Sequence, residues 1–304
     1  MVLVSTWWRK MFAVISQSDA TPEGSPITDS VIQVNGRAEI SFKHGDDGTR
    51  LDHLYHHDPV RVVFPAPAQE DIPQATVITT SGGLTGGDII AVTATVHDRA
   101  RAMVAAPAAE KIYRSAGRDA QIDVALTAAP DTWLEYLPQE TILFDGARLD
   151  RTTRIDAAPD AQVLAGEIIV LGRRGSGETF QHGFLREAWR INLKNRLAWA
   201  DTLLLNEIKD GPLHHPAGFD GAAAIATAVY IGPDASGHLD LARDLVACSG
   251  DGVKSSATLV NGLLIVRWLG REALPLRTAF GWFWQNFRHG AAGLPAKMPR
   301  LWDM

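Results

Sequence analysis

Three carboxylates in the middle of the chain, Asp145, Glu167 and Glu178, are the residues whose types and settings could do chemistry. Glu167 interrupts the nearly continuous apolar run of residues 163–171, where an ionised carboxylate needs a partner or a pKa shift. Asp145 and Glu178 stand beside glycines, where a side chain can face a cavity. Such carboxylates could form an acid/base pair, as in glycosidases, or a set of hard oxygen ligands for a metal ion. A position of Glu167 at a strand edge, facing water, is the alternative.

Histidine clusters are weaker candidates for metal ligands. His53, His56 and His57 fall on one strand-like segment, so His53 and His57 share a face while His56 takes the other. The pair His214 and His215 precedes a proline, a pattern more typical of a loop. We expect ordinary surface or loop histidines in both places.

The signatures of common enzymes are missing from the sequence. No metalloprotease, nucleophile-elbow, P-loop or Rossmann pattern occurs, and Gly175-Ser176-Gly177 lacks the spacing of a nucleophile elbow. The carboxylates still leave open a β-rich carbohydrate-active enzyme or binding module. Two of them close together in an open cleft would favour that alternative, whereas carboxylates placed along an internal channel would count against it.

A glycine-rich segment, residues 81–88, lies between two strand-like runs. Residues 75–79 before it are rich in β-branched types and residues 92–97 after it alternate, so the segment joins strand to strand. A phosphate loop needs a helix behind it, and an aspartate would repel phosphate, so we expect a structural turn, with a binding role as the alternative. Its motif residues are Gly82, Gly83, Gly86, Gly87 and Asp88.

A series of short motifs follows this segment. In chain order they are Lys111-Ile112-Tyr113-Arg114, Leu137-Pro138-Gln139-Glu140-Thr141, Phe144-Asp145-Gly146-Ala147, Gly166-Glu167, Leu171-Gly172-Arg173 and Gly177-Glu178. Together with Gly82-Gly83-Leu84-Thr85-Gly86-Gly87-Asp88, this ordered set resembles the UreD family of urease accessory proteins. The resemblance runs from about Val31 to Trp302.

The resemblance implies a mainly β protein of stacked, mostly antiparallel sheets in one elongated domain, with two helices in the C-terminal part. It implies a non-enzymatic, cytoplasmic scaffold that joins the urease apoprotein to the F-type accessory protein, through which the nickel-dependent G-type GTPase is recruited. Nickel in transit would follow an internal route, with no tightly bound cofactor. Asp145, Glu167 and Glu178 are then the candidates for a transient nickel path, because weak, incomplete ligand sets let an ion leave again.

Composition limits the partners and the compartment. The net charge of −6 and the pI near 5.9 provide no basic footprint for nucleic acid, and no apolar stretch approaches the roughly 20 residues of a membrane span. One cysteine, Cys248, excludes an intramolecular disulfide framework, which fits a reducing cytoplasm. We expect residues 1–30 to form a mobile extension and residues 31–304 a single UreD-type β-rich domain.

Two C-terminal segments have helical periodicity. Residues 239–247 carry one apolar face, and Pro275 suits the first turn of a second helix. That helix has one continuous aromatic face, formed by Phe280, Phe283, Trp284 and Phe287. Trp282 lies elsewhere on the helical wheel, which indicates a partner surface beyond the core face. The candidate partner contacts are Trp282, Phe283 and Arg288.

Overall fold

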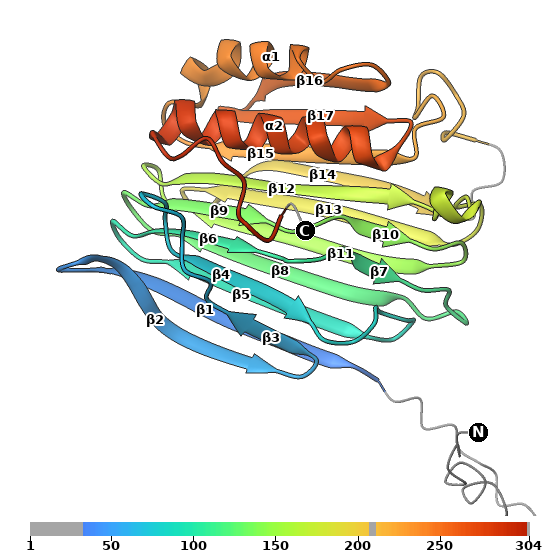
Figure 1. The fold of residues 1–304 in the computed structure, drawn as a ribbon, viewed down its shortest axis with the longest axis horizontal. Helices are drawn as coiled ribbons and strands as arrows, with labels where there is room; N and C mark the ends of the chain where they lie inside the picture. Colours follow the sequence, from blue (N-terminus) through green and yellow to red (C-terminus); the bar gives the residue numbers. More distant parts are fainter. Residues whose placement is uncertain (1–32, 207–210, 303–304) are drawn as a thin grey trace, which may run out of the picture. The chain divides into compact units, whose positions relative to one another are not determined.

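Alternating apolar residues build the strands of a two-sheet sandwich. In β5 (Ile89–Val96), for example, every second residue from Ile90 to Val96 is buried, whereas the residues between them are half-buried. The computed structural model describes residues 33–206 and 211–302, and in this part of the chain the apolar sides of two sheets face each other (Figure 1). The residues between the sheets form the larger of two hydrophobic cores.

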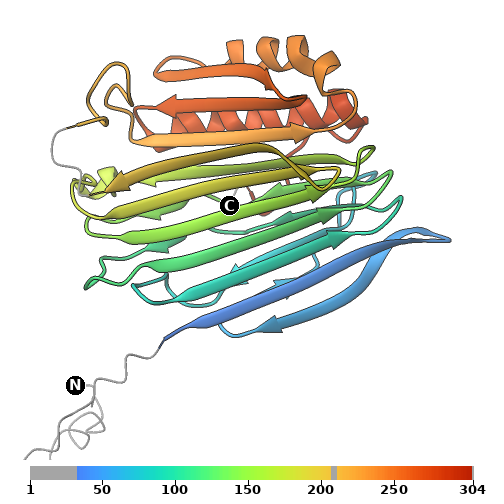
Figure 2. The same cartoon turned by 180° about the vertical axis from the view of Figure 1, so that it is seen from behind.

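The seven-stranded sheet is parallel in its middle and has an antiparallel hairpin at each edge (Figure 2). Its middle strands β11, β8, β5 and β1 run parallel, and the hairpins are β13 with β14 and β1 with β2. In spatial order the strands are β14 (Arg196–Asn206), β13 (Phe184–Leu193), β11 (Arg148–Ala157), β8 (Ala120–Ala128), β5 (Ile89–Val96), β1 (Asn35–Gly45) and β2 (Gly48–His57).

The ten-stranded sheet faces it and is also mixed. Eight strands form a continuous series, and the short β10 (Thr141–Leu143) and β7 (Glu110–Ile112) extend from β12. The series is β16 (Val253–Val260), β17 (Leu263–Gly270), β15 (Ala224–Ile231), β12 (Gln162–Leu171), β9 (Trp133–Leu137), β6 (Arg101–Ala105), β4 (Gln74–Thr79) and β3 (Val60–Val63).

These strand directions confirm a mainly β fold of stacked sheets but correct the expectation that the pairing is mostly antiparallel. Between β4 and β13 the chain repeatedly crosses from one sheet to the other, as in β4 to β5 to β6 and β11 to β12 to β13. In this stretch, most strands that follow one another in the sequence therefore lie in different sheets. Neighbours within a sheet are reached by crossover connections, which is the connection that parallel pairs require.

Strand β12 is buried on both faces because it lies between the seven-stranded sheet and a helix. Val163 and Ala165 belong to the core between the sheets, and Glu167 continues the same period-two series. On the opposite face, a Cβ atom added at Gly166 would lie 2.7 Å from the ring of Phe280, so a glycine lets the helix approach. The double burial explains the continuous apolar run in the sequence.

Two helices cover the outer side of the ten-stranded sheet (Figure 1). They are α1 (Leu239–Ala247) and α2 (Ala273–Ala292), and two 3-10 turns are η1 (Arg174–Ser176) and η2 (Ala235–His238). The expected aromatic face of α2 is buried in a second hydrophobic core, where Trp268 of β17 packs edge-on against Phe280 and Phe283. The two predicted C-terminal helices are thus confirmed, whereas the predicted extension, residues 1–30, lies outside the described residues.

Candidate functional site between the two sheets

A buried cluster of three charged side chains, Arg151, Glu167 and Glu187, joins the two sheets. Arg151 of β11 and Glu187 of β13 are direct cross-strand partners, with 2.5 Å between Arg151 Nε and Glu187 Oε2. Arg151 Nη2 donates to Glu167 Oε2 of β12, in the opposite sheet, over 2.9 Å. The buried cluster therefore contains one guanidinium and two carboxylates held between the sheets.

Two neutral side chains hold the buried cluster in place. Arg151 Nη1 donates to Thr141 Oγ1 of β10 over 2.8 Å, and Trp189 Nε1 donates to Glu167 Oε1 over 2.8 Å. Trp189 follows Glu187 by two residues on β13, so both side chains face the same side of the strand. Strand periodicity on β11, β12 and β13 thus delivers every charged member to one point in the interior.

Burial dominates the electrostatics of the buried cluster. It raises the pKa of Glu187 well above its usual value, against the opposing effect of the Arg151 charge, and Glu167 reinforces the rise. Burial also raises the pKa of the nearby Tyr136 to about 12. For Arg151 the two carboxylates outweigh burial and raise the pKa further, so this guanidinium stays charged.

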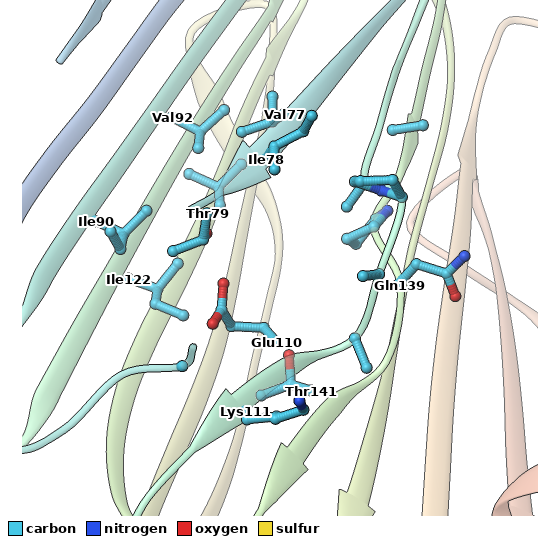
Figure 3. A pocket seen from close by; sticks show the side chains of 18 of the residues that line it. Val77, Ile78, Thr79, Ile90, Val92, Glu110, Lys111, Ile122, Gln139 and Thr141 are labelled. Atoms are coloured by element: carbon cyan, nitrogen blue, oxygen red, sulfur yellow. The ribbon is translucent and has the colours of Figure 1, made fainter. Parts of the chain in front are cut away.

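A cavity of about 240 Å³, here called the first cavity, lies on one side of the buried cluster. Its walls are largely apolar side chains of both sheets, including Val77, Ile90 and Ile122 (Figure 3). Arg151 also borders it. Figure 3 shows the carboxylate of Glu110 pointing between these walls. Burial raises the pKa of Glu110, and Gln139 and Thr141 are further polar side chains that line this cavity.

The glycine segment forms part of the rim of the first cavity and joins β4 to β5, as predicted. Gly83 has φ +146°, and a Cβ atom there would lie 2.6 Å from the carbonyl oxygen of Lys111. At Gly86 the requirement is space, since a Cβ atom would lie 2.3 Å from the carbonyl oxygen of Arg118. Asp88 is buried, and its carboxylate accepts N–H bonds from Thr85 and from Val34 of the chain entering β1.

A second cavity, of about 390 Å³, lies on the other side of the buried cluster. Glu167, Glu187 and Trp189 border it at the inner end. Asp201 of β14 and Arg267 of β17 also border it and form an ion pair between the two sheets, with 2.6 Å between Oδ2 and Nη2. Both of these side chains are partly exposed, so the second cavity extends from the buried cluster to the protein surface.

The other two predicted path residues lie elsewhere. The Asp145 N–H donates to Glu178 Oε1, and Glu178 also accepts from Arg173, while Asp145 Oδ1 accepts the N–H groups of Gln181 and His182. The Asp145 N–H lowers the pKa of Glu178, and backbone donation outweighs burial and lowers the pKa of Asp145. Asp145 borders a different, open pocket, so the three carboxylates do not share one cavity. Their glycine neighbours mark a tight loop in place of a channel wall.

The candidate partner contacts on α2 also separate. Trp282 is 44% exposed and remains available to a partner. Phe283 and Arg288 are buried inside the chain, which corrects the expectation that they form a partner surface. Phe283 packs on Trp268, and Arg288 pairs with Glu135 of β9, because both side chains face the sheet.

Sequence reasoning missed Arg151 and Glu187, although a signal was present. Arg151 falls in phase with the buried apolar residues Leu149 and Ile155 of β11, and Glu187 falls in phase with Leu185 of β13. A charged residue at an inward position of an alternating strand indicates a buried polar site. Among the described residues, no group of three or more His, Cys, Asp or Glu side chains is arranged to hold a metal ion.

Comparisons with known proteins place the chain in a family. Residues 34–303 match the family model described as UreD urease accessory protein. The chain is 42% identical over 274 residues to a protein named urease accessory protein UreD from Magnetococcus marinus, covering 89% of this chain and 94% of that protein. A protein of the same name from Granulibacter bethesdensis is 39% identical over 242 residues, covering 79% and 99%. In the described part of the chain, no helix combines the length and apolarity needed to span a bilayer. The chain belongs to the UreD family of urease accessory proteins.

Proposed function

We propose that this chain is a scaffold in urease maturation that conducts nickel through the space between its two sheets. In this proposal it binds the urease apoprotein and the F-type accessory protein, and the nickel-dependent G-type GTPase joins through the F-type protein. Membership of a urease accessory family supports the link to urease. The buried cluster between the two cavities is the single observation that supports an internal route.

The chemistry of the buried cluster suits an ion in transit. Carboxylate oxygens are acceptable ligands for nickel, and two carboxylates without a cysteine or a histidine make a weak set. Arg151 competes with a metal ion for the same oxygens, so an ion that enters is not retained. Conduction needs binding that is favourable enough for entry and weak enough for exit. The chain then holds no tightly bound cofactor, and nickel is its cargo.

The proposed scaffold role fits a cytoplasmic protein that catalyses no reaction of its own. The only cysteine, Cys248, is a free thiol, which suits a reducing compartment. The alternative of a carbohydrate-active enzyme or binding module gains no support from the carboxylates. Asp145 and Glu178 adjoin each other, but their oxygens accept bonds from backbone N–H groups and from Arg173. A glycosidase pair needs one acid and one base free to reach a sugar.

Co-expression tests this proposal. Urease is produced together with its other accessory proteins, with and without this chain, and nickel is measured per urease active site. We expect nickel occupancy to fall sharply when the chain is omitted, and the chain to co-purify with urease and with the F-type protein. Equal nickel occupancy in both preparations contradicts the proposal.

A further inference from the structure

Arg151 stands at the boundary between the two cavities. Its guanidinium contacts Glu187, Glu167 and Thr141 through three different nitrogens, and its exposed fraction is only 6%. Arg151 borders the first cavity, whereas the two glutamates border the second. Any small ion that moves between the cavities meets the guanidinium and its two carboxylates on the way.

The buried cluster has an incomplete set of contacts. Glu187 Oε1 is buried and has no hydrogen-bond partner among the described residues, although the Glu187 side chain borders the second cavity. Buried carboxylate oxygens normally have partners, and the partner that the buried cluster itself supplies to Glu187 is Glu167, through the proton that burial favours on Glu187. A cation that enters from the second cavity competes with this proton for the same oxygens.

The guanidinium occupies the place that such a cation would take. A divalent ion compensates Glu167 and takes the place of the proton on Glu187, because an uncompensated buried charge is costly. Arg151 compensates the two glutamates without being able to leave, since arginine keeps its proton and is fixed to the strand. Without Arg151, Glu167 and Glu187 would hold a divalent ion longer than the wild-type cluster does, beside the hydroxyl of Thr141.

We propose that Arg151 is a tethered cation that prevents the passage from retaining nickel, so that an ion crosses by displacing the guanidinium and leaves when the guanidinium returns. This inference rests on the proposed transport of nickel. It assigns Arg151 as a positioning residue that sets how long an ion stays between the cavities. A monovalent ion, with half the charge, competes less well for the two carboxylates, so the same contact favours divalent ions.

A purely structural ion pair is the competing account. The chain offers one for comparison, because Arg288 is also fully buried against two carboxylates, Glu135 and Asp71. Arg288 borders neither of the two cavities, and both Glu135 oxygens have partners. Removal of Arg288 should therefore cost stability without creating a nickel site. Removal of Arg151, in contrast, should increase the affinity for nickel.

The test measures Ni²⁺ affinity of the isolated full chain by competition with a chromophoric chelator. Arg151→Gln should bind Ni²⁺ at least about tenfold more tightly than the wild type, and adding Glu167→Gln should abolish the gain. Arg151→Lys keeps the charge but cannot bridge both carboxylates, so a smaller gain is expected. The matched control is Arg154→Gln on the same strand, where an exposed pair with Asp123 is lost and the affinity should not change.

Wild-type Ni²⁺ affinity in a folded Arg151→Gln variant overturns the inference. If that variant does not fold, wild-type affinity in folded Arg151→Lys overturns it equally. The proposed function fails separately, when a chain with Glu167→Gln still supplies urease with full nickel. A gain in affinity in the isolated chain supports the role of Arg151 in either case, because that measurement involves no urease.

Discussion

Arg288 of α2 and Glu135 of β9 form an ion pair in which both side chains are fully buried, with 2.9 Å between Arg288 Nε and Glu135 Oε1. Arg288 Nη2 also lies 2.6 Å from Asp71 Oδ1, and Nη1 donates to the carbonyl oxygen of Pro295. Trp284 Nε1 donates to Glu135 Oε2. One arginine thus connects the C-terminal helix to the sheet, to the segment before β4 and to the segment after α2.

Replacement of Arg288 by methionine should destabilise the protein severely. The variant leaves the buried Glu135 carboxylate without its positively charged partner, and breaking a buried pair in this way costs about 3–5 kcal/mol. Chemical denaturation of the isolated chain measures the loss. Arg190→Met, on an exposed position of β13, is the control and should change the free energy of unfolding little. Equal stability of the two variants would show that the Arg288 network contributes nothing.

The glycine segment should not tolerate a side chain at Gly86 but should tolerate one at Gly82. A Cβ atom at Gly86 would lie 2.1 Å from Ser115 Oγ and 2.3 Å from a backbone oxygen, so Gly86→Ala should cost about 1–3 kcal/mol. At Gly82 the nearest atom is the Tyr113 hydroxyl at 3.9 Å, and Gly82→Ala should fold normally. Thermal unfolding of both variants measures the difference in stability. A stable Gly86→Ala variant that fails only in urease activation would assign the segment a binding role.

We expect Trp282 to contribute to the binding of a partner. Its exposed side chain on α2 should act as a hot spot for the F-type protein, so Trp282→Ala should weaken co-purification, by about 2 kcal/mol in binding free energy. Leu274→Ala removes another exposed apolar side chain of the same helix and serves as the control. Undiminished binding by folded Trp282→Ala would show that this surface does not bind the F-type protein.

Glu187 should make stability depend on pH. Burial raises the pKa of Glu187 above 4.5, so the folded state holds this proton over a range in which the unfolded state releases it. The stabilisation is complete below pH 4.5 and decreases as the pH rises through the folded-state pKa. Glu187→Gln imitates the protonated form, and its free energy of unfolding relative to the wild type should increase with pH. A difference that stays constant between pH 5 and 8 contradicts the raised pKa.

The helices and strands were predictable wherever the apolar residues of a segment followed a single helical or strand periodicity. The aromatic face of α2 and the alternation in β5 reflect local geometry, and both segments fold as expected. The pairing of the strands was less accessible, because it depends on which sheet each strand joins. Repeated crossing between the sheets produces parallel neighbours, and no local pattern in β4, β5 or β6 records that crossing.

The candidate site was predictable only from the residue that broke a pattern. Glu167 stood out because its strand is apolar on both sides. Arg151 and Glu187 lie in strands whose outward positions are also polar, so only their phase distinguishes them. Arg288 follows Trp284 by four residues and therefore lies on the same buried face of α2, although a charged side chain is usually found at the surface. In both clusters the charged side chains are buried because they pair with charges that are far away in the sequence.

The nickel content of urease made with a Glu167→Gln variant shows whether nickel passes the buried cluster. The variant is co-expressed with urease and its other accessory proteins, and nickel is measured per active site. Asp123→Asn, on the exposed face of β8, is the matched control. We expect the Glu167→Gln chain to fold and to co-purify with its partners, and we expect the urease to contain clearly less nickel than in the control. Full nickel occupancy with the variant would show that the ion does not pass the buried cluster.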